Sequence, residues 1–283
     1  MQKNFSLKLG LRSVFTGALL LVSASSMAAS TWSLSGCTQG ATNANNFGNS
    51  YSCSAGGNTV SAFAFGSNGT SYAAARMADW GSGSGLGVES VVDGLGTASP
   101  EHAMDNNPSG SPDLIVLKFT TAVALDYVTL GWTSSDADIT VMAYTGALTG
   151  STDQAKATNL IGGKTASNLT TGGAGAGWAM VSNYGDADPS GATGSAASGT
   201  DVKYVNSSNV VSSWWLISAY NSGFGGGRLD SLADYVKLLS VASKDIVPPP
   251  PGVKVPEPAS LALTSLALLG AFGARRRQLR KQA

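Results

Sequence analysis

The chain has 283 residues, of which 12% are charged and 36 are glycine, and its formal net charge is zero. Eight of the 17 lysines and arginines lie in the first 12 and the last nine residues, so the body between them holds nine basic residues against 17 acids, a net charge near −8. Such a body repels phosphates and suits divalent cations, which excludes nucleic acid as a partner. The shortage of long helix-forming runs predicts many short strands.

The first 28 residues have the pattern of a secretion signal. Three basic residues precede an apolar stretch at 14–22, and small residues fill 23–30. This order is typical of a Sec-type signal peptide, and Ser26 and Ala28 suit a cleavage site after Ala28. An uncleaved anchor helix is the alternative. We therefore expect export, with the Sec machinery and signal peptidase as partners.

The two cysteines of the chain, Cys37 and Cys53, both follow this signal. An even number of cysteines in an oxidising compartment predicts a disulfide, which for a loop of this size contributes roughly 3 kcal/mol in the chain-entropy model. Two free thiols are the alternative. A catalytic cysteine is disfavoured, because His102 is the only histidine.

Short strands separated by glycine- and asparagine-rich turns are predicted along residues 29–246, and period-two alternation is clear at Val128, Leu130 and Trp132. One short helix is expected at 153–160 in an otherwise loop-like segment, 148–177, and a loop at 188–200. The predicted strands are Thr59–Phe65, Tyr72–Trp80, Leu86–Val92, Leu114–Thr120, Tyr127–Trp132, Ile139–Tyr144, Trp178–Ser182, Trp214–Tyr220 and Tyr235–Val241. Such a series favours an all-β fold, an antiparallel β-sandwich that is jelly-roll-like.

Side chains with oxygen ligands lie in the loops that flank these strands. Calcium takes about six to eight oxygen ligands, and loops at one end of a sandwich can supply them. Asp and Asn are also common in turns and caps, which is the alternative, and no D-x-D-x-D-G loop is present. The candidate Ca²⁺ ligands are Glu101, Asp105, Asn106, Asp113, Asp136 and Asp138.

His102, beside Glu101, is a candidate general base or metal ligand, with a structural hydrogen-bond donor as the alternative. No second histidine can complete a zinc pair, and the G-x-S-x-G and H-E-x-x-H signatures are absent. A carboxylate pair for glycoside hydrolysis leaves no spacing rule in a sequence. We predict that the protein is not an enzyme.

Tryptophans are the remaining candidates for ligand contact, since exposed indoles stack on sugar rings. Trp214 and Trp215 are adjacent, so in a strand they point to opposite faces. Trp178 and Trp215 are the candidates for glycan stacking, with burial in the core as the alternative. Glycines at 223–227 do not form a phosphate loop, because no GxxxxGK[ST] motif is present.

The last 37 residues contain three successive segments. A proline-rich linker, 247–258, favours extended polyproline II. The uncharged segment 259–274 is predicted to be a transmembrane helix, although it is shorter than the usual span of about 20 residues. A basic tail, 275–283, is placed in the cytoplasm by the positive-inside rule. Its cations are Arg275, Arg276, Arg277, Arg280 and Lys281.

The sequence Val255-Pro256-Glu257-Pro258, followed by the apolar segment and the arginine cluster, resembles the PEP-CTERM sorting signal of Gram-negative bacteria. That resemblance implies recognition by an exosortase and removal of the tail. Residues 86–242 resemble the bodies of exosortase-dependent surface proteins, which implies class and location and no particular chemistry. The expected course is export, a transient inner-membrane intermediate, and then the cell surface or extracellular matrix.

Three functions fit these features. The first is a structural or adhesive role in the envelope or the extracellular polysaccharide matrix, with exopolysaccharide as a partner. The second is a calcium-assisted carbohydrate-binding module that uses Trp178 or Trp215 and the Asp105 loop. The third, and weakest, is a secreted hydrolase.

Overall fold

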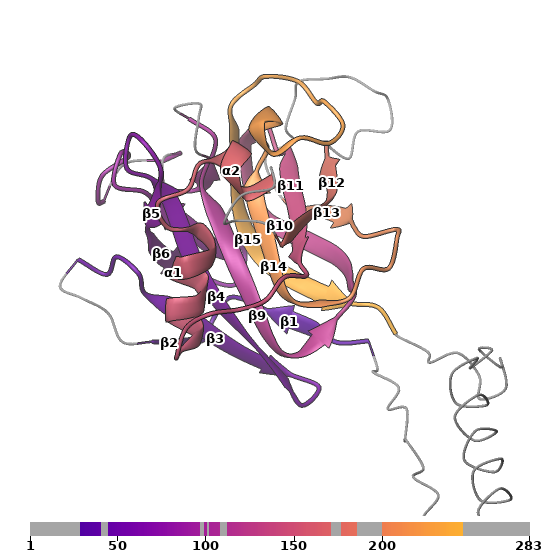
Figure 1. The fold of residues 1–283 in the computed structure, drawn as a ribbon. Helices are drawn as coiled ribbons and strands as arrows, with labels where there is room; N and C mark the ends of the chain where they lie inside the picture. The colour runs from indigo at the N-terminus through magenta and orange to yellow at the C-terminus, as the bar shows by residue number, and fades with distance from the viewer. Residues whose placement is uncertain are drawn as a thin grey trace, which may run out of the picture. The chain divides into compact units, whose positions relative to one another are not determined.

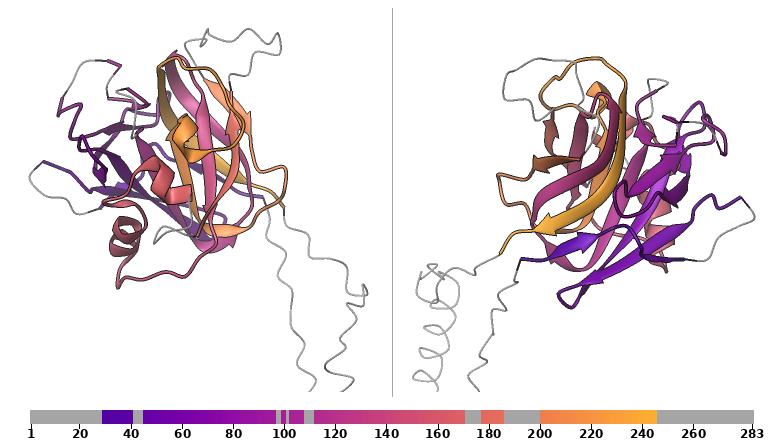
Figure 2. Two further views of the ribbon diagram at one scale, coloured as in Figure 1. Left: turned by 45° about the horizontal axis from the view of Figure 1, so that its top comes forward. Right: turned by 180° about the vertical axis from the view of Figure 1, so that it is seen from behind.

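Two antiparallel β-sheets packed face to face form the body of the protein in the computed structural model (Figures 1 and 2). The structure describes residues 29–40, 45–96, 99–100, 102–107, 112–170, 177–185 and 200–245, all within one unit, Met27–Ile246. The predicted signal peptide, Glu101, most of the 188–200 loop, the linker, the apolar segment and the basic tail lie outside the described residues. None of the helices in the described part of the chain combines the length and apolar character that crossing a membrane requires.

The first sheet is built around a long central pair of strands, β10 and β15. Along its other edge β15 pairs in turn with three short strands, β8, β7 and β1. The strands in sheet order are β13 (Asp201–Tyr204), β10 (Leu125–Ser135), β15 (Asp234–Ser243), β7 (Leu86–Glu89) and β6 (Arg76–Asp79), with β8 (Met104–Asp105) and β1 (Thr31–Ser33) also on β15.

The second sheet is larger, and its pairings are also antiparallel. Its order is β12 (Trp178–Tyr184), β11 (Ile139–Tyr144), β14 (Ser212–Ala219), β9 (Leu114–Val123), β4 (Asn58–Ser67), β3 (Ser50–Ala55) and β2 (Thr38–Gln39), with β5 (Tyr72–Ala74) on β4. An all-β antiparallel sandwich is therefore confirmed, whereas the jelly-roll comparison stays a prediction.

Side chains from both sheets form the main core, and a second core lies on the outer face of the second sheet. Strand β14 shows the division: Trp215 and Ile217 face the first sheet, whereas Trp214 and Leu216 face outward. The outward side chains pack with residues of α1 (Asp153–Ile161), α2 (Ala166–Thr170) and the 3₁₀ turn η1 (Ser222–Phe224). Figure 1 shows α1 and α2 beside this sheet. Both faces of the centre of this sheet are buried, which explains the unbroken apolar run at the start of β9.

Two predictions of local structure need correction. The single strand predicted at Tyr72–Trp80 is split, because the chain leaves the second sheet after Ala74 and enters the first sheet at Arg76. Ala75 is fully buried at this crossing.

The helix predicted at 153–160 is confirmed as α1, whose N-cap hydroxyl on Thr152 accepts from the Ala155 amide at 3.1 Å. The segment that follows was predicted as loop but includes α2.

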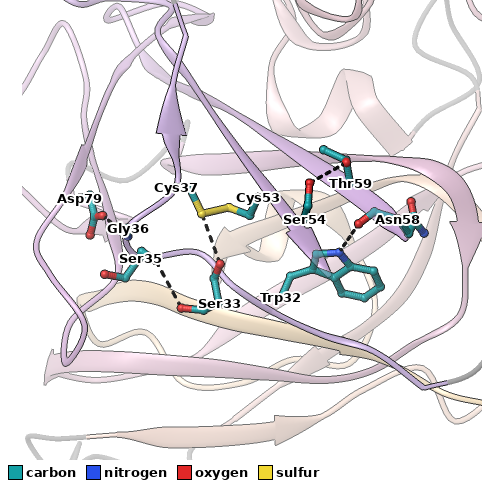
Figure 3. The surroundings of a disulfide bond; sticks show 10 residues. All are labelled: Trp32, Ser33, Ser35, Gly36, Cys37, Cys53, Ser54, Asn58, Thr59 and Asp79. Atoms are coloured by element: carbon teal, nitrogen blue, oxygen red, sulfur yellow. Dashed lines mark hydrogen bonds between the residues drawn. A yellow bond between two sulfur atoms is a disulfide. The ribbon is translucent and has the colours of Figure 1, made fainter. Parts of the chain in front are cut away.

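The predicted disulfide between Cys37 and Cys53 is confirmed, with the two Cα atoms 5.0 Å apart (Figure 3). Between β1 and β2 the chain passes from the first sheet to the second, and the disulfide joins this passage to β3. Cys53 is buried against the main core. Nearby, the Trp32 indole donates from Nε1 to the carbonyl oxygen of Asn58 at 3.0 Å, which fixes β1 against the β3–β4 hairpin.

Removing the disulfide by the double change Cys37→Ala and Cys53→Ala is expected to lower the free energy of unfolding by about 3 kcal/mol, because the unfolded chain regains the freedom of the 16-residue loop. Urea unfolding under oxidising conditions measures the difference. A reductant should weaken the wild type by a similar amount and leave the double variant unchanged. Equal stability of the oxidised wild type and the variant would contradict this prediction.

Candidate metal centre

Six aspartates meet at the end of the sandwich where β9, β11 and β15 begin and where β10 and β14 end. They form two groups, and within each group one carboxylate oxygen from every member lies within 4.8 Å of the others. Antiparallel pairing brings these strand ends together, although the residues are far apart in sequence. The first triad is Asp93, Asp105 and Asp113, and the second triad is Asp136, Asp138 and Asp234.

The first triad joins the turn after β7 to β8 and to the residue before β9. The Asp113 amide donates to the Asp105 carbonyl oxygen at 2.6 Å, which fixes these two residues side by side. Asp93 is positioned by Ser90, whose amide donates to Asp93 Oδ2 at 3.0 Å. Asp105 and Asp113 are buried, whereas Asp93 is half-buried and opens the triad toward solvent.

The Asp113 carboxyl group is under unusual electrostatic stress. Among the residues that the structure describes, its Oδ2 is buried and has no hydrogen-bond partner. Burial raises the pKa of Asp113 well above its usual range, and the charges of Asp105 and Asp93 raise it further. A buried polar atom without a partner costs roughly 1–3 kcal/mol. A proton or a cation at the triad would relieve this stress.

The second triad is a hydrogen-bonded network. Asp234 Oδ1 accepts from the Asp138 amide at 2.7 Å, and its Oδ2 accepts from Asn106 Nδ2 at 2.5 Å. All three aspartates are buried. Burial, followed by the charges of Asp136 and Asp138, raises the pKa of Asp234 to about 9. Both oxygens of Asp234 already accept hydrogen bonds from the protein.

Asn106, a predicted ligand, is used for internal hydrogen bonding. Its Nδ2 donates to the carbonyl oxygen of Tyr220 at 3.0 Å, and its Oδ1 accepts from the Asp234 amide at 2.9 Å. Of the predicted ligands, Asp105 and Asp113 belong to the first triad, and Asp136 and Asp138 belong to the second. Asp93 and Asp234, which the sequence did not single out, complete the triads. Each resembles an ordinary turn or strand-end residue, so no sequence signal distinguishes it.

His102 packs among aromatic rings on the first sheet. Its ring stacks on Trp80 at a centroid distance of 4.0 Å and lies 6.1 Å from Trp132. The ammonium group of Lys237 lies 3.8 Å from the Trp132 ring centroid and 5.0 Å from that of Trp80. Neither of the two triads found among the described residues includes His102. These contacts account for the position of His102 by packing.

The tryptophans proposed for glycan stacking are buried. Trp215 is fully buried and Trp178 is 6% exposed, so neither offers a ring face to a sugar, and their proposed role does not fit the structure. Trp215 is buried because it lies in the core between the two sheets, whereas Trp178 is buried in the second core together with residues of α1, α2 and η1. Trp80 is the more accessible indole, at 44% exposure.

A cavity of about 280 Å³ lies next to the second triad. Asn106 lines it and also bonds to Asp234, which connects the cavity wall to the triad. Most of its other lining groups are polar. They include Asn107, Asn221, Arg228 and Asp230.

Comparison with protein families gives one finding. The family described as the PEP-CTERM protein-sorting motif matches residues 254–277, beyond the described residues. Comparisons with curated proteins and with solved structures gave no match. The motif marks a protein that is exported, is held at the membrane as a sorting intermediate, and is directed by an exosortase toward the cell surface. The chain therefore carries a PEP-CTERM protein-sorting motif at residues 254–277.

Proposed function

We propose that this protein is a structural or adhesive component of the cell envelope or the extracellular polysaccharide matrix, and that an exosortase removes its C-terminal tail during delivery. The observation that carries the proposal is the sorting motif at 254–277, because proteins with this motif are sorted toward the cell surface. The disulfide between Cys37 and Cys53 suits an extracellular compartment. The body is acidic, sparsely charged and rich in small polar residues, which keeps its surface hydrated.

A calcium-assisted carbohydrate-binding module is the second candidate. The cavity beside the second triad favours it, because asparagine amides, Arg228 and Asp230 can donate to and accept from sugar hydroxyls. The indole of Trp80, which is 44% exposed and stacks on His102, is the aromatic ring that we propose for contact with a sugar. A glycan array probed with and without chelator separates this function from a purely structural one.

The leading proposal is tested by intact-mass analysis of the protein from its native host and from a strain without the exosortase. We expect the wild-type protein to lack the mass of the arginine-bearing tail. A variant with Pro256, Glu257 and Pro258 replaced by alanine should keep the tail in both strains. Val253→Ala, just before the matched residues, is the control and should be processed normally.

The adhesive role is measured in the same strains by the cohesion of the extracellular matrix. Deleting the gene should weaken the cohesion of the matrix. Returning the wild-type gene should restore this cohesion, whereas returning the gene of the alanine variant should not. Retention of the tail by the wild type in its native host would exclude processing. Normal cohesion after deletion would exclude the structural role.

A further inference from the structure

The first triad has a feature that clustering of acids alone does not explain. Asp113 is 3% exposed, and its Oδ2 is buried without a hydrogen-bond partner among the residues described. An oxygen of the same carboxylate lies within 4.8 Å of oxygens of Asp93 and Asp105, so the group is directed into the triad. A carboxylate oxygen in this position offers an unused lone pair to a ligand.

The residues around Asp113 leave room for its carboxylate. At Gly66, on β4, a Cβ atom would lie 2.1 Å from Asp113 Oδ1 and 2.5 Å from the Ser90 Cβ, so a larger residue would displace the acid. Tyr72, on the adjacent β5, is also buried, and within the described part of the chain its hydroxyl has no hydrogen-bond partner. Burial and the charge of Asp113 both raise the pKa of Tyr72. Asp113 and Tyr72 are thus two buried groups with unmet bonding capacity.

We propose that Asp93, Asp105 and Asp113 form a divalent-cation site that takes Ca²⁺. The donors are hard carboxylate oxygens from three separate segments, the chemistry that Ca²⁺ selects. Calcium binds oxygens at about 2.3–2.6 Å, so two oxygens on one ion are at most about 5 Å apart. The oxygens of the triad meet this limit, since all lie within 4.8 Å of one another. Half-buried Asp93 gives the ion a route from solvent and leaves space for water ligands.

The site is independent of the proposed adhesive role, because it concerns only the geometry of the body. An ion here would fix the turn after β7 to β8 and to the start of β9. The second triad provides an internal comparison, since both oxygens of Asp234 already accept hydrogen bonds from the protein. The competing explanation is that the first triad holds protons instead of a metal ion.

The experiment uses the full-length protein purified in detergent and stripped with EDTA. Calcium binding is measured by isothermal titration and by Tb³⁺ luminescence, and the melting temperature is recorded in EDTA, Ca²⁺ and Mg²⁺. We expect one Ca²⁺ at the first triad and a melting temperature that rises with Ca²⁺ concentration. Asp113→Asn should bind Ca²⁺ at least tenfold more weakly. In EDTA it should melt above the wild type, because the substitution removes a buried carboxyl group whose ionised form the native protein disfavours.

Asp93→Asn tests the same site with less risk to folding, because Asp93 is half-buried. Asp126→Asn, on β10 and outside both triads, is the matched control and should behave as the wild type. The proposal is overturned if the wild type binds no Ca²⁺ below millimolar concentration. It is also overturned if both triad variants bind as the wild type, or if Asp136→Asn alone abolishes binding. An equal melting gain for Asp113→Asn in EDTA and in Ca²⁺ would show that the triad holds protons.

Discussion

Replacing Trp215 with alanine is expected to lower the free energy of unfolding by about 3–5 kcal/mol. Trp215 is fully buried on β14, in the core between the two sheets. Its Nε1 donates to the carbonyl oxygen of Ser212 at 3.0 Å. The substitution therefore leaves a large cavity and also removes the partner of a buried carbonyl group.

Urea unfolding followed by far-UV circular dichroism measures this loss and avoids the missing tryptophan signal. Tyr204→Ala is the matched aromatic control, because Tyr204 is 75% exposed on β13 and its removal should change stability by less than about 1 kcal/mol. A loss below about 1 kcal/mol for Trp215→Ala would contradict the placement of this ring between the sheets.

The stability of the domain in EDTA is expected to fall as pH rises from about 4 to about 9. The pKa of Asp234 is raised from 3.8 to about 9, first by burial and then by the charges of Asp136 and Asp138. Across this interval the native protein keeps a proton that the unfolded chain releases, so rising pH favours the unfolded state. Each pKa unit corresponds to roughly 1.4 kcal/mol, so the change at pH 8 is on the order of a few kcal/mol.

Asp234→Asn should flatten this dependence, because asparagine occupies the same volume and does not titrate. Some slope should remain, since the raised pKa of Asp113 acts in the same direction. The free energy of urea unfolding at several pH values measures the effect, with Asp126→Asn as the control. A variant whose stability still falls as steeply as that of the wild type would show that Asp234 is ionised in the native protein.

The central strands of the fold could be predicted because burial on defined faces leaves a pattern in the sequence. Ile139–Tyr144 has the predicted limits, β9, β10 and β15 contain the predicted segments, and β14 contains all of Trp214–Tyr220 except Tyr220. Strands β1, β2 and β8 have two or three residues each, too few for alternation to be detected. They exist because β15 and β3 provide edges to pair with. The crossing at Ala75 was missed for a different reason, because a change of sheet leaves the apolar pattern of the sequence unchanged.

Most of the aspartates of the candidate site could be predicted from the sequence, but the way they divide into two triads could not. Asp105, Asp113, Asp136 and Asp138 do lie at one end of the sandwich, as strand-flanking acids should. Which acids meet depends on strand pairing, and Asp138 is 96 residues from Asp234, to which its amide donates. Likewise, alternation placed Trp214 and Trp215 on opposite faces of their strand. Only the structure shows that the first sheet covers the face of Trp215 and that α1 and α2 cover the face of Trp214.

The position of β15 has a mechanical consequence for a tethered protein. Ser243 ends this strand, and the chain that follows leads to the sorting motif, so tension from an attachment point on that side enters the domain at the end of β15. The strand lies between β10 on one side and β8, β7 and β1 on the other, as the right view of Figure 2 shows for β1. A pull along the axis of β15 loads both rows of hydrogen bonds in shear, so they must yield together. The domain is therefore expected to unfold at a higher pulling force than a domain that is pulled by a strand at a sheet edge.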